Sequence, residues 1–187
     1  MEYAMLSHLQ LQSSSDQEDY RLYPAIAVGE TAGVLPEQLA VWSYPLAGSD
    51  TDATAFNMVN AMLGRIHQSG RLDQLSPASF AQVKKGLQVY KETIRMHTGR
   101  AMPYYPLGMP DLTDTVSPIA LGMRSPDANF IAVWRLRGEE RVRVPHVSRE
   151  ARILYPADLG IRVEPQGNGC DVIFPRELMA CILTLQT

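Results

Sequence analysis

The sequence has few cysteines, a small net charge and no long apolar run. Two cysteines, Cys170 and Cys181, are too few to staple a chain of 187 residues, so we expect each to be reduced, buried and structural. Seventeen basic and twenty acidic residues include no basic stripe, so we expect no nucleic-acid partner. No apolar segment approaches the roughly twenty residues that span a bilayer, and no signal peptide is recognisable. We therefore expect no membrane partner and a cytoplasmic protein.

Motifs for metals and cofactors are also missing from the sequence. No pair of histidines or cysteines has the spacing of metal ligands, and there is no G-x-G-x-x-G segment or phosphate-binding loop. The run 167–169, Gly-Asn-Gly, predicts a hairpin turn instead. We therefore expect no metal and no cofactor. The sequence has four histidines that could bind a metal, and they lie far apart: His8, His67, His97 and His146.

Helical patterns dominate the chain before Pro110, and the composition changes between Pro110 and Pro118. The acidic and hydroxylic lead-in at 49–52 predicts a capped amphipathic helix. The pair 76–77, Ser-Pro, predicts the start of a second helix, which Gly99 should end. This second helix should present one apolar stripe, made of Phe80, Val83, Leu87, Tyr90 and Ile94.

Short β segments follow Pro118, each bounded by turn residues. They lie at 117–124, 129–137, 140–146, 151–155, 161–164, 171–174 and 178–185. Seven such segments predict an antiparallel sandwich. We expect segment 129–137 to bury one face, with Arg135 and Arg137 appearing on the other. The usual role of such a domain is structural support, and sugar binding is the alternative.

The first twenty residues combine an alternating segment with a loop rich in carboxylates. Alternation of polar and apolar residues over 8–12 predicts a half-buried strand that ends at the serine run 13–15. Asp16, Glu18 and Asp19 follow this run. In a barrel of parallel strands, the loops after the strands carry the chemistry, so this placement suits a catalytic acid. The alternative is that Ser-Ser-Ser-Asp caps a following helix.

A resemblance to a known family rests on this segment. Residues 2–7, Glu-Tyr-Ala-Met-Leu-Ser, and 12–19, Gln-Ser-Ser-Ser-Asp-Gln-Glu-Asp, resemble the D-Y-x-x-L-S and W/S-T-S-D-x-x-D segments of family-36 glycoside hydrolases, the microbial α-galactosidases. The resemblance implies that Asp16 is the general acid/base of a retaining mechanism. Further similar segments occur in the same order at 21–26, 35–38, 41–45, 56–60 and 89–91.

The resemblance implies an α/β plus β fold with two domains. Residues 1–110 would form the C-terminal part of a (β/α)8 TIM barrel, and residues 111–187 a C-terminal antiparallel β-sandwich. Helical periodicity alone continues to Ile66, whereas the resemblance places a turn near Met62 and makes 63–69 the last barrel strand. We follow the resemblance at this point.

The motifs that would carry the family's nucleophile and sugar-binding loop, K-W-D-x-N and C-x-S-G-G-x-R, do not occur in the sequence. The resemblance therefore implies the C-terminal portion of a longer enzyme, whose missing N-terminal part is an expected partner. Because the family often forms tetramers, the resemblance also allows a homo-oligomer.

The candidate site residues are Asp16 as catalytic acid/base and Asp19, Trp42 and His67 as substrate-binding residues. A retaining glycosidase needs two carboxyl groups about 5 to 5.5 Å apart, of which Asp16 would be one. The alternatives for Asp19 are a solvated loop charge and an ion pair with Arg21. Trp42 could stack on a sugar face or pack inside the barrel. His67 is expected at the mouth of the last strand.

The function expected from the resemblance is that of a retaining α-galactosidase, which hydrolyses terminal α-galactosyl residues of oligosaccharides such as raffinose. This chain would supply the acid/base but not the nucleophile, so by itself it should be inactive. Transfer of galactose and removal of N-acetylgalactosamine stay open within the enzyme class. The alternative from another class is a non-catalytic carbohydrate-binding or structural module.

Overall fold

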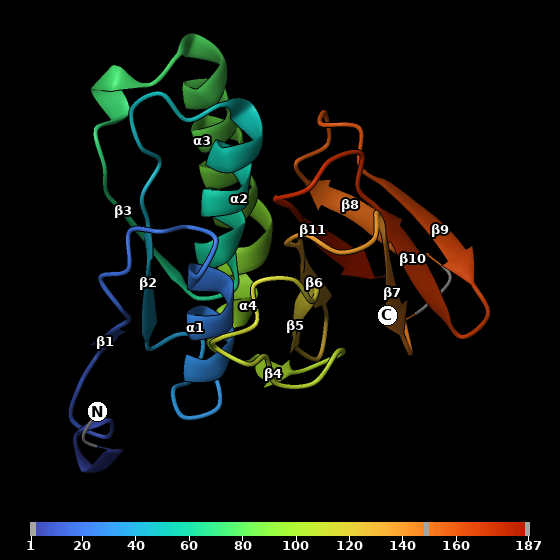
Figure 1. Cartoon of the computed structure of the whole chain (residues 1–187). Helices are drawn as coiled ribbons and strands as arrows, with labels where there is room; N and C mark the ends of the chain where they lie inside the picture. Colours follow the sequence, from blue (N-terminus) through green and yellow to red (C-terminus); the bar gives the residue numbers. More distant parts are fainter. Residues whose placement is uncertain (1–2, 148–149, 186–187) are drawn as a thin grey trace.

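Four layers follow one another across the computed structural model: a small parallel sheet, a layer of helices, a five-stranded antiparallel sheet and a three-stranded antiparallel sheet (Figure 1). The structure describes residues 3–147 and 150–185. Met1 and Glu2, at the start of the first family-like segment, lie outside these ranges. Within the described ranges, no helix is both long enough and apolar enough to cross a membrane.

The parallel sheet and its helices alternate along the chain. Strands β1 (Gln12–Ser13), β2 (Leu39–Ser43) and β3 (Arg65–Gln68) are parallel and lie in the order β1-β2-β3. Helix α1 (Tyr23–Glu30) connects β1 to β2, and α2 (Thr51–Met62) connects β2 to β3. The predicted turn near Met62 and the strand after it are confirmed. Parallel strands joined through helices are the repeating unit of α/β folds.

The predicted strand over 8–12 is wrong except at its last residue. A short 3-10 helix, η1 (Tyr3–Met5), precedes this region, and β1 begins only at Gln12. The reason is that β1 pairs with β2 alone, from Gln12 opposite Leu39 onward, so no strand lies beside residues 8–11. Leu9 and Leu11 are consequently exposed instead of half-buried.

Both predicted helix starts are confirmed. The side chain of Asp50 caps α2 by accepting a hydrogen bond from the backbone N–H of Ala53 at 2.8 Å. The Ser76 hydroxyl caps α3 (Pro77–Val89) by accepting from the Ser79 N–H at 3.1 Å. A π-helical turn, η3 (Tyr90–Ile94), and α4 (Arg95–Thr98) continue α3 up to the residue before Gly99.

The apolar stripe of this long helix is buried at three positions, half-buried at Leu87 and exposed at Phe80. Val83 and Ile94 are fully buried, whereas Phe80 is 41% exposed and lies outside the buried core cluster. A second 3-10 helix, η2 (Leu72–Gln74), lies in the connection before α3.

All seven predicted β segments are present, with slightly different ends. They are β5 (Ile119–Arg124), β6 (Asn129–Arg135), β7 (Arg141–Pro145), β8 (Arg152–Tyr155), β9 (Arg162–Gln166), β10 (Gly169–Ile173) and β11 (Met179–Leu185). The sequence reading missed β4 (Met102–Tyr104), which pairs with β5. The five-stranded sheet thus begins before residue 111, and the domain division at that residue stays a prediction.

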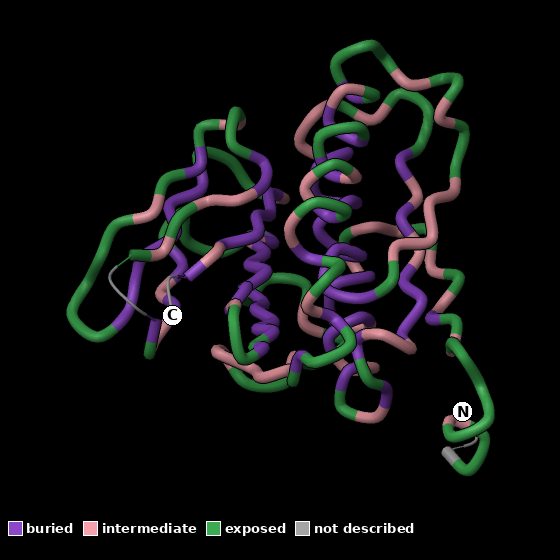
Figure 2. Tube along the Cα trace, turned by 180° about the vertical axis from the view of Figure 1, so that it is seen from behind, coloured by how far each residue is buried: buried purple, intermediate pink, exposed green. Residues whose placement is uncertain are grey.

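The two antiparallel sheets form the predicted sandwich, with strand orders β4-β5-β6-β11-β8 and β7-β10-β9. The expectation of one buried face for 129–137 is wrong, because β6 buries both faces. Phe130 and Trp134 pack against the helices, while Ile131 and Val133 pack against the three-stranded sheet. A continuous apolar run is typical of a strand in a middle layer. Figure 2 shows the buried residues concentrated along this layer and the helices beside it.

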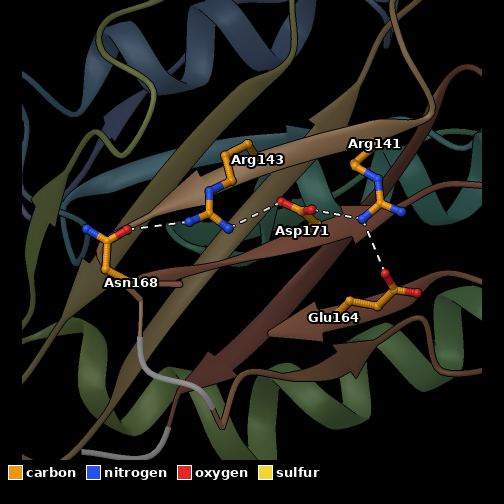
Figure 3. A network of polar contacts seen from close by, with 5 residues as sticks. All are labelled: Arg141, Arg143, Glu164, Asn168 and Asp171. Atoms are coloured by element: carbon orange, nitrogen blue, oxygen red, sulfur yellow. Dashed lines mark hydrogen bonds and ion pairs between the residues drawn. The ribbon is translucent and has the colours of Figure 1, made fainter. Parts of the chain in front are cut away.

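The solvent face of the three-stranded sheet carries an ion-pair network around Asp171 (Figure 3). Arg141 contacts the Asp171 carboxylate at 2.8 Å and Arg143 contacts it at 3.3 Å. Arg141 also reaches Glu164 at 3.2 Å, and Arg143 donates to the Asn168 side chain at 3.4 Å. These contacts join β7, β10 and β9 side by side, and Asp171 itself is only 4% exposed.

The prediction that both cysteines are reduced and buried is confirmed. Cys170 and Cys181 are buried in the core between the two antiparallel sheets and form no disulfide. Burial raises the pKa of the Cys170 thiol to about 11, and burial likewise raises the pKa of Cys181. Both side chains therefore act as small apolar core residues.

Candidate functional site

The candidate site lies at the edge of the parallel sheet where all three strands end. One face of this sheet is covered, because Val41 packs with Ala61 of α2 in a shared core. Successive residues of a strand point to opposite faces, so Trp42 lies on the face away from α2. His67 is the register partner of Trp42 on β3 and lies on the same face. The helix-free face of the sheet thus carries aromatic side chains near its C-terminal edge.

Three half-buried rings form what we call the aromatic cluster: Trp42, Tyr44 and His67. The rings of Trp42 and Tyr44 are stacked, with centroids 5.8 Å apart and planes at 19°. His67 meets Trp42 edge to face, with centroids 5.0 Å apart. The indole N–H of Trp42 donates to the Ser13 hydroxyl at 2.9 Å. This surface has both an apolar ring face and polar edges, which is the chemistry that a sugar ring requires.

The loop after β1 is anchored immediately before Asp16. The backbone N–H of Ser14 donates to the Ala40 carbonyl at 2.9 Å and so extends the pairing of β1 with β2. The Tyr23 hydroxyl donates to the Ser15 carbonyl at 2.8 Å and also bonds to the Ser14 hydroxyl. Asp16 follows with an exposed side chain. A hydrogen-bonded backbone therefore presents the exposed side chain of Asp16 at the edge of the sheet.

Asp16 does not serve as a helix cap. Helix α1 begins at Tyr23, and its N-cap residue, Leu22, has no side-chain cap. Burial raises the pKa of the Tyr44 hydroxyl, and the negative charges of Asp16 and Glu18 raise it further. The carboxylates are therefore close enough to the aromatic cluster to act on it electrostatically.

The Asp19 carboxylate is bound to Arg21. Two hydrogen bonds join them, Nε to Oδ1 at 2.8 Å and Nη2 to Oδ2 at 2.6 Å. The side-chain hydrogen bond from Arg21 is the main reason that the pKa of Asp19 lies below its usual value. The ion pair foreseen as the alternative for Asp19 is thus present, and substrate contact by Asp19 stays a prediction.

Of the four predicted site residues, Trp42 and His67 are in contact on neighbouring strands, and Asp16 and Asp19 lie in the loop after β1, where Asp19 is held by Arg21. In the described ranges, no cluster of three or more His, Cys, Asp or Glu side chains is arranged to hold a metal ion. The sequence reading missed Tyr23 as an anchor of the loop, because nothing in its position within the chain signals a contact with Ser15.

Two buried asparagines of α2 were also missed. The Asn57 side chain accepts a hydrogen bond from the Tyr44 N–H at 3.0 Å and donates one to the Tyr44 carbonyl at 2.8 Å. The Asn60 side chain donates to the Tyr20 carbonyl at 3.0 Å and accepts from the Trp134 indole N–H at 2.8 Å. Each asparagine thus fixes the backbone of a loop that leaves the candidate site. An asparagine in an apolar helix pattern is the only sequence signal that could have revealed them.

Comparison of the fold with solved structures finds glycoside hydrolases. The galactosidase domain of the α-galactosidase–sucrose kinase AgaSK superimposes with a TM-score of 0.66 at 17% identity, over 92% of this chain and 25% of that one. The GH36 α-galactosidase AgaA from Geobacillus stearothermophilus, in a variant complexed with raffinose, gives a TM-score of 0.65 at 13% identity, again over 92% and 25%. A GH27 β-L-arabinopyranosidase from the same organism gives 0.55 at 11% identity, over 98% and 46%.

No protein-family model matches the sequence, and no curated protein matches it. The structural likeness confirms the predicted resemblance to GH36 α-galactosidases at the level of the fold. The chain spans about a quarter of the length of these α-galactosidases. It therefore has the fold of one portion of a glycoside hydrolase.

Proposed function

We propose that this chain is the C-terminal portion of a retaining α-galactosidase, in which its parallel sheet supplies the last three strands of a TIM barrel and Asp16 supplies the general acid/base. One observation carries the proposal: at the end of the parallel sheet, on the face away from α2, the indole N–H of Trp42 in the aromatic cluster donates to the hydroxyl of Ser13, three residues before Asp16. In a closed barrel that face would be the lumen, and that edge the mouth at which barrel enzymes bind substrate.

The proposed chemistry follows from the exposed position of Asp16. In the first step its carboxylic acid protonates the glycosidic oxygen as the leaving sugar departs from the galactosyl carbon. A second carboxylate attacks that carbon, and in the next step the Asp16 carboxylate takes a proton from the water that releases galactose. The second carboxylate has to come from a K-W-D-x-N strand, which these residues do not contain. The 187 residues alone are therefore expected to be inactive.

The aromatic cluster suits the apolar face of galactose. The rings of Trp42 and Tyr44 are stacked and half-buried. The indole N–H of Trp42 already donates a hydrogen bond to the Ser13 hydroxyl. Ring stacking thus contributes to binding without leaving a buried donor unpaired. AgaA binds raffinose in one of the similar structures, and for this chain a terminal α-galactoside is the proposed ligand.

The test begins with the reading frame upstream of the Met1 codon, where we expect the K-W-D-x-N and C-x-S-G-G-x-R motifs. The complete protein is then assayed with raffinose and with 4-nitrophenyl α-galactoside. Asp16→Asn should lower kcat/KM for raffinose by about 10³-fold, because the sugar leaving group needs an acid. The same variant should show a smaller fall in kcat/KM for the nitrophenyl substrate, because nitrophenolate leaves with little protonation. Added azide should restore turnover of this substrate by Asp16→Asn.

Asp127→Asn is the matched control, since Asp127 is exposed and paired with Arg100 on the sandwich. It should leave both activities unchanged. Raffinose hydrolysis by Asp16→Asn at the wild-type rate, or by the 187-residue chain alone, would refute the assignment of Asp16. Sugar binding by the sandwich has no comparable support, because its tryptophan, Trp134, is only 1% exposed.

A further inference from the structure

Helix α2 carries two buried amide side chains on one face. Asn57 is 3% exposed and Asn60 is 5% exposed, and their neighbours Phe56, Met58 and Val59 are fully buried apolar residues. Residues three positions apart lie on the same side of a helix, so the two amides point in similar directions. Burying an amide is unfavourable unless its hydrogen-bonding groups are satisfied. What the two amides bind is therefore informative.

Each amide holds the backbone of one loop at the candidate site. Asn57 binds both the N–H and the carbonyl of Tyr44, directly after β2. Asn60 binds the carbonyl of Tyr20, in the loop that starts at β1 and carries Asp16. The Tyr20 ring also packs edge to face on Phe56 of α2, with centroids 5.2 Å apart. One helix therefore fixes both loops of the site.

The partners also fix which way each amide faces. A backbone N–H and the Trp134 indole N–H can only donate, whereas a backbone carbonyl can only accept. The Tyr44 N–H therefore requires the Asn57 oxygen, and the Tyr20 carbonyl requires the Asn60 nitrogen. The oxygen of Asn60 is left for Trp134, at 2.8 Å. Neither leucine nor aspartate could make both bonds.

Trp134 connects this arrangement to the β-sandwich. It lies on β6 in the middle of the five-stranded sheet, and its ring packs into the core shared with the helices. The chain of hydrogen bonds runs from Trp134 through Asn60 to Tyr20, which lies four residues after Asp16. A rigid element of the sandwich thus supports the loop of the candidate acid.

We infer that Asn57 and Asn60 are positioning residues of the proposed α-galactosidase site, and that Trp134 gives the sandwich a direct role in holding the acid loop. The catalytic part of this inference rests on the proposed function. The structural part, that Asn57 and Asn60 fix the backbones of the two loops, can be measured independently. Misplacing a catalytic group by about 1 Å costs on the order of 10²-fold in rate.

The first experiment measures hydrogen exchange of backbone amides in the 187-residue chain. Asn60→Ala should speed exchange in the loop 14–22 by about tenfold or more, with the three-stranded sheet unchanged. Trp134→Phe keeps an aromatic ring in the core but removes the indole N–H together with part of the ring, and it leaves Asn60 in place, so it should give a smaller change in the same loop. It also serves as the second variant should Asn60→Ala fail to fold.

Tyr155→Phe is the matched control. The Tyr155 hydroxyl lies in the same buried layer and donates to the Gln82 carbonyl on α3 at 3.1 Å, away from both loops. Its loss should leave exchange in 14–22 unchanged. Exchange that accelerates uniformly over the chain in Asn60→Ala and Trp134→Phe, or that is unchanged in 14–22, would overturn the inference.

The second experiment measures kinetics of the complete enzyme. Asn60→Ala should lower kcat for raffinose by about tenfold or more, with less effect on 4-nitrophenyl α-galactoside, because a displaced acid matters most for a poor leaving group. Equal losses on both substrates would overturn the positioning role. If instead Asp16→Asn has no effect, the proposed function fails, while the exchange experiment still decides whether Asn60 holds the loop.

Discussion

Gly122 is a position where one methyl group should destabilise the fold strongly. It lies in β5 between β4 and β6, with register partners Tyr104 and Ile131. The Tyr104 ring lies across Gly122, so that a Cβ added there would be 2.1 Å from Tyr104 Cζ and 2.2 Å from Cε1. Because β5 is hydrogen-bonded on both sides, the strand cannot move away. Gly122→Ala should therefore expel the ring from its place.

The cost follows from what the displaced ring gives up. The Tyr104 hydroxyl donates to Asn129 Oδ1 at 2.7 Å, a bond whose loss costs about 1 kcal/mol. The Arg124 guanidinium lies 4.9 Å from the ring centroid, an interaction of about 0.5–1 kcal/mol. Overpacking a filled site adds about 1–3 kcal/mol. We expect the free energy of unfolding to fall by about 2–5 kcal/mol.

Urea unfolding followed by circular dichroism measures this change, and Tyr104→Ala provides the control. With the ring removed, the added methyl group meets little, so Gly122→Ala in the Tyr104→Ala background should cost less than about 1 kcal/mol. A single variant within about 0.5 kcal/mol of the wild type would refute the reasoning. So would an equal cost in both backgrounds.

Three further predictions concern titration and capping. Because burial raises the pKa of Cys170 to about 11, both cysteines should react with a disulfide reagent at pH 8 far more slowly in the native chain than in urea; equal rates would contradict their burial. Burial raises the pKa of Glu30 from 4.5 to about 7, so the folded state retains a proton that the unfolded chain releases. The free energy of unfolding should therefore fall as pH rises through this interval, and Glu30→Gln should remove that slope in urea titrations at pH 5 and pH 8; an unchanged slope would assign it to other groups. Asp50→Ala should destabilise by about 1 kcal/mol through loss of the α2 cap, measured by thermal unfolding, whereas Asp50→Asn should retain most of the stability.

Local signals in the sequence predicted the parts of the fold that depend on neighbouring residues. The caps at Asp50 and Ser76 satisfy backbone groups within one turn, so residue type and spacing are sufficient. The seven predicted strands of the sandwich are short segments bounded by turn residues, which again is a local property. Strand β4 was missed because it has only three residues and contains Pro103.

The errors arose where structure depends on distant partners. Residues 8–11 alternate like a strand, but a strand needs a neighbour, and β2 offers partners only from Leu39 onward. Ile66 continues the helical pattern of α2, and only the likeness to a family placed it on β3. Whether both faces of β6 are buried depends on which layers lie above and below it.

In the candidate site too, local signals were informative and contacts between distant residues were not predicted. The position of Asp16 after a strand followed from the serine run at 13–15, and the position of His67 at the end of the last strand followed from the resemblance. That Trp42 lies beside His67 on the neighbouring strand was not predicted. The Asp19–Arg21 pair was foreseeable from a separation of two residues. Asn57 and Asn60 interrupt an apolar helix pattern, which is a local signal, but their contacts join residues 13 to 74 positions apart, so their partners could not be predicted locally.

The position of β6 between two cores has a consequence for how proteins with this fold can change over generations. Neighbouring residues of this strand pack against different layers. Ala132 packs against the helices, and Val133 packs against the three-stranded sheet. A gene fusion that brought in a foreign sandwich would have to match the helical layer residue by residue along β5, β6 and β11. The three-stranded sheet, which touches only one layer, is the part that recombination could exchange with the fewest compensating substitutions.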